Sequence, residues 1–130
     1  MNSEVEVPMK PKILVVDDEW SMQELLSLIL VMAGFDVVLA GNEEEFRRET
    51  RAHQPDVIIL DIILGNQNGV QVYEELLKEG LDPDIPVVFL SALAQDRPPT
   101  PPQPGRRYAL IGKPFDSDVL VRELRSLVKT

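Results

Sequence analysis

Acidic and basic side chains stand at the ends of three short apolar segments of this chain. The segments are KILVVDDE (12–19), DVIILDII (56–63) and ALIGKPF (109–115), with Asp17-Asp18, Asp61 and Lys113 at or near their ends. Short runs rich in Val, Ile and Leu predict strands that are buried on both faces. Because parallel strands end together at the carboxyl edge of a sheet, we expect these side chains to share one crevice. Three carboxylates and one ammonium group would suit a divalent metal ion and a phosphoryl group there.

The residue types in this crevice predict separate roles. Asp61 is the candidate nucleophile, because a carboxylate can attack phosphorus and form an acyl phosphate. Asp17 and Asp18 are candidate Mg²⁺ ligands, since this ion is usually held by one or two carboxylates together with water and phosphate oxygens. Lys113 can neutralise charge on the phosphoryl oxygens, and Ser91, which closes the apolar run VVFLS, can donate a hydrogen bond to one of them. No P-loop and no GxGxxG motif occurs, so the phosphoryl group must come from another protein or a small donor.

Length and composition favour one globular domain. The chain has 130 residues, of which 44% are hydrophobic, and this is enough for one full core. A net charge of −9 argues against direct binding to nucleic acid or to an anionic membrane. There is no cysteine, which excludes disulfides and a thiolate zinc site. We see no membrane-spanning stretch and no signal peptide in the sequence, so we expect a cytoplasmic protein.

The apolar patterns alternate between strand and helix along the chain. Strands are expected at 12–17, 36–40, 57–61, 87–90 and 108–112, and helices at 21–33, 43–53, 70–78 and from 116 or 117 onward. Such alternation predicts parallel strands joined by right-handed crossovers. The expected fold is therefore α/β: a flavodoxin-like, doubly wound, five-stranded parallel sheet with strand order 2-1-3-4-5. Residues 1–11 are expected to form an N-terminal tail and residues 12–130 the domain.

Three local patterns refine the predicted helices. Helical spacing in the first helix predicts a core face formed by Leu25, Leu26, Ile29 and Met32. Gly34 suits the end of that helix, because glycine readily adopts the left-handed conformation found there. Asn42 and Glu45 predict a capping box at the start of the second helix.

A proline-rich segment interrupts the alternation before the fifth strand. Residues 98–104 read PPTPPQP, and proline removes a backbone donor and clashes with the preceding helical turn. We therefore expect the fourth helix to be missing or replaced by a loop at 98–105. This loop could simply cover the sheet. It could also be a polyproline docking site for a partner, flanked by Arg97, Arg106 and Arg107.

The order of these motifs resembles the receiver domains of two-component response regulators over roughly residues 12–129. The matching positions are Asp17-Asp18, Asp61, Gly69, Ser91 and Lys113-Pro114-Phe115. The resemblance implies that Asp61 is the phosphoacceptor and that a histidine kinase or a phosphotransfer protein supplies the phosphoryl group. It also implies that a downstream protein partner reads the result.

The resemblance further implies a set of ligands around Asp61. Mg²⁺ would be held by Asp17 or Asp18, by Asp61 and by the backbone carbonyl of Ile63. Ser91 and Lys113 would bind the phosphoryl group and act as switch residues, and the Lys–Pro peptide is commonly cis in the family. Self-phosphorylation and autodephosphorylation at Asp61 would then be the only chemistry, so the chain is not expected to be an enzyme in any wider sense.

Some positions depart from the family pattern. Gly65 stands where a proline is frequent after the acceptor, and we expect only a local change of loop. Leu110 stands where a switch aromatic residue is common, and Tyr108 lies two residues upstream on the same strand face. Ile63 and Leu93 occupy positions that are often polar and that influence dephosphorylation. Apolar side chains there could hinder an attacking water, which predicts a long-lived phosphoryl group.

Three other functions are weighed against the phosphoacceptor. A phosphorylation-independent interaction module, or pseudo-receiver, would keep the fold and bind a partner through the proline-rich loop. An aspartate-based phosphohydrolase would need a general acid two residues after the nucleophile, where this chain has Ile63. A flavodoxin is disfavoured because the acidic loop after the first strand would repel a phosphate. Each acid, Ser91 or Lys113 could alone be a helix cap or a solvated side chain, but the ordered set favours the phosphoacceptor.

Overall fold

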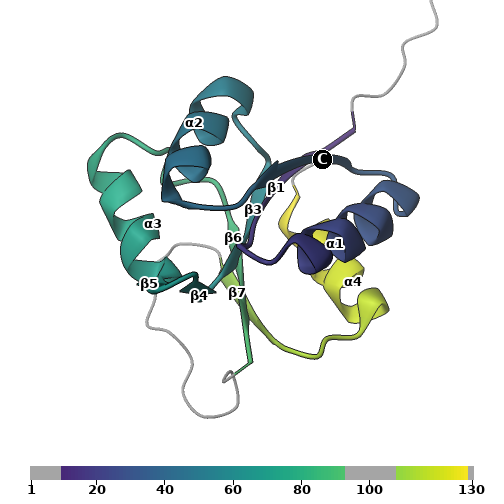
Figure 1. Ribbon diagram of the computed structural model, residues 1–130. Helices are drawn as coiled ribbons and strands as arrows, with labels where there is room; N and C mark the ends of the chain where they lie inside the picture. Colours follow the sequence, from purple (N-terminus) through teal and green to yellow (C-terminus); the bar gives the residue numbers. More distant parts are fainter. Residues whose placement is uncertain (1–9, 93–107, 129–130) are drawn as a thin grey trace, which may run out of the picture.

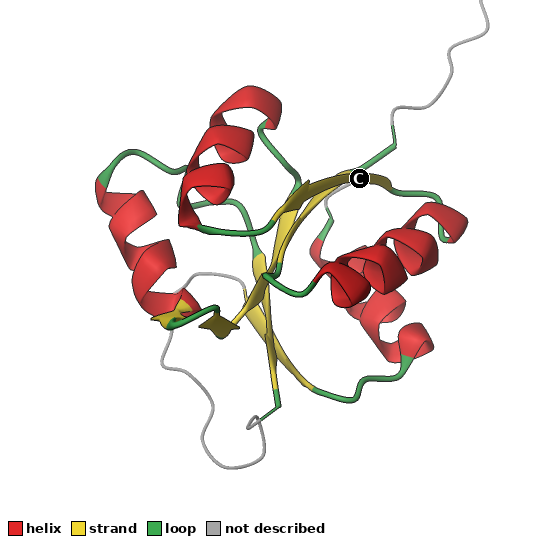
Figure 2. Ribbon diagram, in the orientation of Figure 1, coloured by secondary structure: helices red, strands yellow, loops and turns green. Residues whose placement is uncertain are grey.

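The computed structural model describes residues 10–92 and 108–128, which form a five-stranded sheet with helices on both faces (Figure 1 and Figure 2). The strands of the main sheet are β1 (Lys12–Val16), β2 (Asp36–Ala40), β3 (Val57–Asp61), β6 (Val87–Ser91) and β7 (Tyr108–Gly112). They lie in the order β2-β1-β3-β6-β7, and all neighbours are parallel. This confirms the predicted flavodoxin-like order 2-1-3-4-5, with β6 and β7 as the fourth and fifth strands of the main sheet.

Two apolar layers hold the helices against the sheet. The helices are α1 (Trp20–Met32), α2 (Glu43–His53), α3 (Gly69–Lys78) and α4 (Ser117–Leu127). Helices α1 and α4 cover one face, and α2 and α3 cover the other (Figure 1). Strand residues alternate between the layers, so that Ile13 and Val15 pack towards α1 and α4, whereas Leu14 and Val16 pack towards α2 and α3. Burying each such side chain stabilises the fold by about 1.5–3 kcal/mol.

Short polar side chains begin three of the four helices. The side chains of Asn42, Asn68 and Asp116 each accept hydrogen bonds from backbone N–H groups of the first helical turn. Losing such a cap typically costs about 1 kcal/mol. The predicted capping box is only half correct, because the Glu45 carboxylate accepts its hydrogen bond from the N–H of Gly41 and not from that of Asn42. The second half of the box is therefore displaced by one residue towards the end of β2.

The predicted core face of the first helix is partly wrong. Leu26 and Leu30 are buried in the core, whereas Leu25 is 46% exposed and Met32 is 80% exposed. Ile29 lies between these two extremes. Nine of the thirteen positions of α1 are apolar, and they are spread around most of the helix, so the hydrophobic pattern does not select one face. The direction in which the helix packs on the sheet decides which leucines are buried.

Smaller corrections concern the ends of the elements. Strand β1 ends at Val16, one residue earlier than predicted, and β6 extends by one residue to Ser91. Helices α1 and α3 each begin one residue earlier than predicted. The loop after β3 contains a small antiparallel hairpin that the sequence analysis did not predict, formed by β4 (Ile63–Leu64) and β5 (Gln67–Asn68). The predicted proline-rich loop lies outside the described residues.

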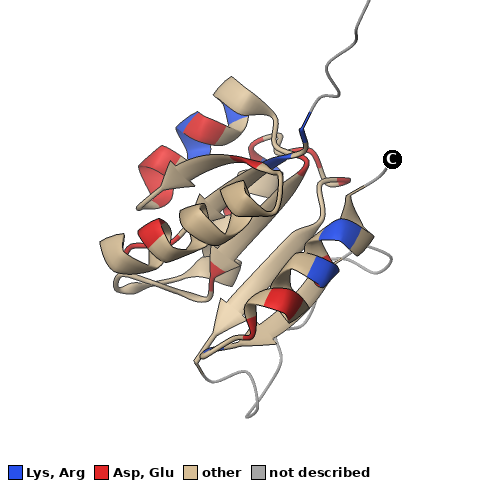
Figure 3. Ribbon diagram, turned by 90° about the vertical axis from the view of Figure 1, so that its right-hand side faces the viewer, with Lys and Arg blue, Asp and Glu red and all other residues tan. Residues whose placement is uncertain are grey.

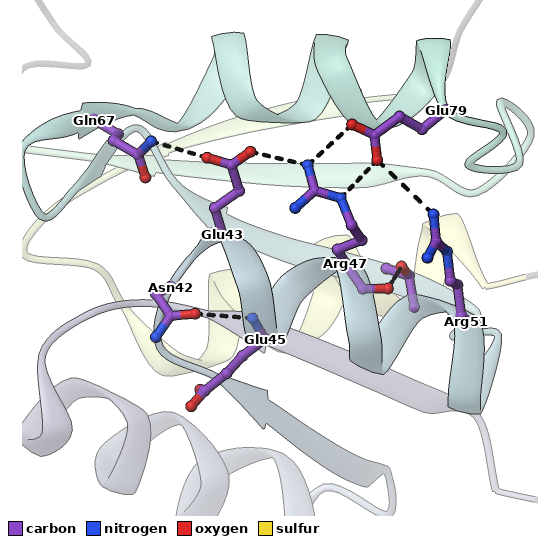
Figure 4. Close-up of polar contacts among 8 residues, drawn as sticks. Asn42, Glu43, Glu45, Arg47, Arg51, Gln67 and Glu79 are labelled. Carbon is purple, nitrogen blue, oxygen red and sulfur yellow. Dashed lines mark hydrogen bonds and ion pairs between the residues drawn. The ribbon is translucent and has the colours of Figure 1, made fainter.

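An exposed polar network joins this hairpin to α2 and α3 (Figure 4). The guanidinium of Arg47 donates to Glu79 at 2.6 Å and to Glu43 at 2.9 Å, and Gln67 donates to Glu43 at 2.9 Å. The hydrogen bonds from Arg47 lower the pKa of both Glu43 and Glu79. Because these groups are in contact with solvent, the network contributes modestly to stability. Within the described ranges, no helix combines the length and apolar character that crossing a bilayer requires.

Candidate functional site

The carboxyl edge of the sheet brings three predicted site residues into contact. Asp17 directly follows β1, Asp61 ends β3, and Lys113 directly follows β7. The ammonium nitrogen Nζ of Lys113 lies 2.7 Å from Oδ2 of Asp61 and 3.5 Å from Oδ2 of Asp17. One cation therefore lies between two carboxylates that come from different strands.

The carboxylate of Asp61 is fixed through both of its oxygens. It is 6% exposed, its Oδ1 accepts a hydrogen bond from the backbone N–H of Ile63 at 3.0 Å, and its Oδ2 accepts from Lys113. A buried carboxylate with this orientation is pre-positioned to act as a nucleophile, because little reorientation is needed before attack.

Asp17 is more deeply buried than Asp61, with 1% of its surface exposed. Its Oδ1 accepts from the backbone N–H of Glu19 at 2.9 Å. Burial raises the pKa of Asp17 from its ordinary value of 3.8 to about 6, although the Glu19 hydrogen bond and the charge of Lys113 oppose the shift. The negative charge of Asp61 raises the same pKa further. Asp17 is thus mostly ionised at neutral pH and becomes protonated as the pH falls through about 6.

Lys113 keeps its charge in spite of partial burial. Burial alone would lower the pKa of Lys113, but its hydrogen bond to Asp61 and its attraction to Asp17 and Asp61 outweigh this effect and raise the pKa. The backbone N–H of Lys113 donates to the carbonyl of Ser91 at 2.9 Å, which ties the loop after β7 to the end of β6. The peptide bond between Lys113 and Pro114 is cis, as the family resemblance implied.

Ser91 lies at the same edge and is 4% exposed. The sheet register pairs Ser91 with Gly112, and it pairs the preceding residue, Leu90, with Asp61. Ser91 therefore lies at the end of β6, between β3, which ends at Asp61, and β7, which is followed by Lys113. Its action on a phosphoryl group stays a prediction.

The aromatic ring of Tyr108 lies at the opposite end of β7 from this edge. Tyr108 pairs with Val87 in the register, and its ring meets that of Phe89 edge to face at a centroid distance of 6.2 Å. Leu110, which stands at the expected aromatic position, pairs with Phe89. Tyr108 therefore belongs to the apolar layer towards α3, and it does not replace an aromatic residue next to Ser91.

The acidic cluster fits a hard divalent cation. Carboxylate oxygens of Asp17, Asp18 and Asp61 lie within 4.8 Å of one another, and Asp18 is exposed to solvent. Three carboxylates against one ammonium leave a formal charge of −2, and oxygen-only donors are those that Mg²⁺ prefers. The backbone N–H of Ile63 is hydrogen-bonded to Asp61, whereas a metal contact of its carbonyl stays a prediction.

Two further residues shape the site, and the sequence analysis either missed them or noted them without a physical reason. Gln23 was missed: its side-chain amide donates to the backbone carbonyl of Asp17 at 2.7 Å and so fastens the acidic turn to α1. Its place in the first turn of the helix that follows Asp17 was the available signal. Gly69 was noted only as a match to the family. A Cβ at Gly69 would collide with the carbonyl oxygen of Asp61 and lie 3.3 Å from the Cα of Ile62, so only glycine fits without a shift of backbone.

Comparison with known sequences agrees with this geometry. A family model described as the response regulator receiver domain matches residues 13–125. The DNA-binding dual master transcriptional regulator RpaA of a Synechocystis strain is 32% identical over 119 residues, which cover 92% of this chain and 49% of RpaA. The probable transcriptional regulatory protein TcrX of Mycobacterium tuberculosis is 33% identical over 119 residues, 90% of this chain and 49% of TcrX. The chain thus spans about half the length of these curated relatives.

Solved structures with the same fold extend the comparison. The receiver domain of the Francisella response regulator 1452 superposes with a TM-score of 0.78 at 24% identity and covers 91% of this chain and 96% of its own. Chemotaxis protein CheY4 of Vibrio cholerae gives a TM-score of 0.76 at 23% identity, and the match covers 92% of this chain and 100% of the CheY4 chain. The receiver domain of NtrX from Brucella abortus gives a TM-score of 0.72 at 28% identity, and the match covers 91% of this chain and 98% of the NtrX receiver chain.

Proposed function

The chain belongs to the response regulator receiver domain family, and from this we propose that it is a phosphoacceptor switch with Asp61 as its acceptor. The observation that carries the proposal is the environment of the Asp61 carboxylate. It is almost fully buried, one oxygen is hydrogen-bonded to a backbone N–H, and the other is paired with Lys113 at 2.7 Å. Apart from the phosphoryl chemistry at Asp61, the chain is not an enzyme.

The transfer step needs only an ionised carboxylate and a phosphorylated donor. An Asp61 oxygen attacks the phosphorus of a phosphohistidine on a histidine kinase or a phosphotransfer protein. A P–O bond forms to Asp61 while the P–N bond of the donor breaks. The electron pair of the P–N bond goes to the imidazole nitrogen of the donor. The other ring nitrogen carries a proton, so the imidazole leaves as a neutral ring. The nucleophile is a carboxylate oxygen, so the step requires no general base.

Asp17, Asp18 and Asp61 would hold the Mg²⁺ ion, together with the backbone carbonyl of Ile63. When bound, this ion neutralises charge on the phosphoryl oxygens and on the three carboxylates. Asp17 must be ionised to act as a ligand. Its hydrogen bond from Glu19 and the Gln23 bond to its backbone carbonyl hold the acidic turn in place for this role.

Phosphorylation changes the charge balance around Lys113. The modified side chain gains roughly −1.5 to −2 charges and new acceptor oxygens. Lys113 then exchanges its contact with the Asp61 carboxylate for one with the phosphoryl oxygens, and Ser91 donates its hydroxyl to the same group. The shift of these two residues, which end β6 and follow β7, alters the surface that a downstream protein partner binds. With a net charge of −9, the chain is not suited to direct contact with nucleic acid.

Intact mass spectrometry tests this function. The protein is incubated with acetyl phosphate and Mg²⁺, in parallel with the Asp61→Asn variant and with wild type in EDTA. We expect one added phosphoryl group on the wild type in Mg²⁺ and none in either control. An equal adduct on Asp61→Asn would contradict the proposal, because the acceptor would then be another residue.

A phosphorylated kinase provides the second donor for the same test. If neither donor modifies the wild type, and partner binding is unchanged in Asp61→Asn, the chain is a phosphorylation-independent interaction module instead.

A further inference from the structure

The β4–β5 hairpin carries the part of the site that follows the acceptor. Strand β4 begins with Ile63, whose backbone N–H donates to Oδ1 of Asp61 at 3.0 Å and whose carbonyl is a proposed metal ligand. In the hairpin, Ile63 pairs with Asn68, and Leu64 pairs with Gln67. A movement of the hairpin therefore changes both the orientation of the acceptor carboxylate and the position of a ligand.

The two strands of the hairpin are held in different ways. Leu64 of β4 is 2% exposed and packs in the apolar layer towards α2 and α3. Both residues of β5 are exposed, so this strand depends on polar contacts. The side chain of Asn68 accepts from the backbone N–H of Val70 at 2.8 Å, which ties β5 to the start of α3. The side-chain amide of Gln67 donates to Glu43 at 2.9 Å, which ties β5 to the start of α2.

The carboxylate of Glu43 is a fixed acceptor for Gln67. Its Oε1 accepts from Gln67, and its Oε2 accepts from the guanidinium of Arg47 at 2.9 Å. Arg47 also donates through two nitrogens to the two carboxylate oxygens of Glu79, at 2.6 and 3.0 Å (Figure 4). The hydrogen bonds from Arg47 and, to a smaller extent, from Gln67 lower the pKa of Glu43, so this carboxylate stays ionised at neutral pH.

The charges of α2 favour this fixed geometry. The helix carries acidic side chains in its first turn and basic ones in its last turn, which suits the helix dipole (Figure 3). Glu43 and Arg47 lie one helical turn apart, and their side chains are only 26% and 27% exposed. A single exposed ion pair holds its side chains loosely, whereas a bidentate arginine within a network of several charges holds them in one orientation. The contact of Gln67 is therefore made to a carboxylate that is already in place.

We propose that Gln67 is a positioning residue for the metal site. Through Glu43 and Arg47 it holds β5 against α2, and the pairing of β5 with β4 passes this restraint to the backbone of Ile63. The inference rests on the proposed function, because it concerns the Mg²⁺ ion and the acceptor assigned there. Ligands and nucleophiles act well only when they are held within about 0.5 Å of the productive geometry, so a restraint one step outside the ligands affects metal affinity.

An NMR titration of the metal-free, unphosphorylated protein with Mg²⁺ tests this role. Gln67→Leu keeps the approximate size of the side chain and removes the donor. We expect its dissociation constant for Mg²⁺ to rise about fivefold, which is less than the roughly 10- to 100-fold loss typical of groups bonded directly to a ligand. Gln71→Leu is the matched control, because Gln71 is exposed in the first turn of α3, and this variant should bind Mg²⁺ as wild type does.

Two further readouts separate positioning from a general loss of stability. In Glu43→Leu the acceptor for Gln67 is gone, so adding Gln67→Leu to this variant should change the Mg²⁺ dissociation constant by less than about twofold. The amide proton of Ile63 reports its hydrogen bond to Asp61. Its chemical shift should move in Gln67→Leu and in Glu43→Leu before any Mg²⁺ is added, and it should not move in Gln71→Leu. A role limited to stability would lower the unfolding temperature and leave both readouts unchanged.

The positioning role and the proposed function fail in different ways. Asp61→Asn alters a proposed ligand directly, so it should weaken Mg²⁺ binding more than Gln67→Leu does. If Asp61→Asn binds Mg²⁺ as wild type does, the metal site is wrong and the positioning role falls with it. If Asp61→Asn weakens binding but Gln67→Leu does not, the positioning role alone is overturned. Fully additive effects of Gln67→Leu and Glu43→Leu would overturn it as well, because the two side chains would then act separately.

Discussion

The ammonium group of Lys113 donates a hydrogen bond of 2.7 Å to Oδ2 of Asp61, which lies 52 residues earlier in the chain. The same group lies 3.5 Å from Asp17, so two buried carboxylates share one cation before any phosphoryl group arrives. An incoming phosphoryl group brings more negative charge to this edge of the sheet. The position of Lys113 is therefore suited both to the resting site and to the modified one.

Replacing Lys113 should slow phosphorylation strongly. In Lys113→Met, the ammonium group no longer helps to offset the charge that develops on the phosphoryl oxygens, and we expect the initial rate with acetyl phosphate and Mg²⁺ to fall about 100-fold. The rate is measured by intact mass spectrometry at a series of times. Lys78→Met is the matched control, because it removes the same charge from an exposed position at the end of α3 and should react at the wild-type rate. A Lys113→Met rate within twofold of wild type would contradict the assigned role.

The raised pKa of Asp17 predicts a stabilising substitution at neutral pH. The pKa is about 6 in the folded protein and near 3.8 when the carboxyl is free, so the folded state binds the proton more tightly. The free energy of unfolding therefore decreases as the pH rises from about 4 to about 6. Asp17→Asn removes the free-energy cost of burying an ionised carboxylate, but it also removes the attraction of that carboxylate to Lys113. We expect a net stabilisation of about 1–2 kcal/mol at pH 7.5 that disappears near pH 4.

Urea unfolding without Mg²⁺, repeated at several pH values, measures this effect. Asp36→Asn is the control for the change in net charge, since Asp36 is exposed on β2 and its substitution should alter stability little at any pH. A lower stability of Asp17→Asn at pH 7.5, or a gain that does not depend on pH, would show that burial does not dominate the energetics of this carboxyl group.

The close approach of Gly69 to the acceptor predicts a steric effect. In Gly69→Ala, the new Cβ meets the backbone carbonyl of Asp61, so the acceptor strand or α3 must move. We expect a loss of about 1–3 kcal/mol in stability and slower phosphorylation. In Gly41→Ala, the Cβ comes closest to the side-chain ends of Gln23 at 3.3 Å and Glu45 at 3.4 Å, which can give way, and it lies at an ordinary contact distance of 3.9 Å from the backbone oxygen of Asp17. Thermal unfolding and phosphorylation rates of the two variants should therefore differ. Equal effects would argue against a special role of Gly69.

The apolar side chain of Ile63 predicts slow loss of the phosphoryl group. Ile63 follows Asp61 by two residues and is 52% exposed, where it cannot orient a water molecule for attack. An amide in its place can hold that water, so Ile63→Asn should shorten the lifetime of the modified state about tenfold. The decay is followed by intact mass after acetyl phosphate is removed. Val119→Asn, which makes a similar change on α4, should decay as wild type does. A lifetime of Ile63→Asn equal to or longer than that of wild type would contradict this explanation.

The strands and the site edge were predictable from the sequence because their signals are local and strong. Buried parallel strands appear as short runs rich in Val, Ile and Leu, and the residues that end them must meet at one edge. This is why Asp17, Asp61 and Lys113 could be placed together from their positions alone. The distances among them depend on strand register and on the loop after β7, which no local pattern specifies.

Other features depend on packing and were missed for that reason. In α1, apolar residues occur on all sides, so the pattern could not distinguish Leu30, which is buried, from Met32, which is exposed. The hairpin of β4 and β5 is too short to produce an alternating pattern. The bond from Gln23 to the carbonyl of Asp17 joins a helix to a loop, and a glutamine side chain alone does not indicate such a contact.

Trapping the acyl phosphate on its residue tests the central claim most directly. Wild type is phosphorylated in Mg²⁺ and reduced with borohydride, which converts a phosphorylated aspartate to homoserine, and the peptides are then sequenced by mass spectrometry. We predict homoserine at position 61, and at no other position that the peptides cover. Homoserine at Asp17 or Asp18 with an unmodified Asp61 would contradict the account, because the acceptor would then be one of the residues assigned to the metal.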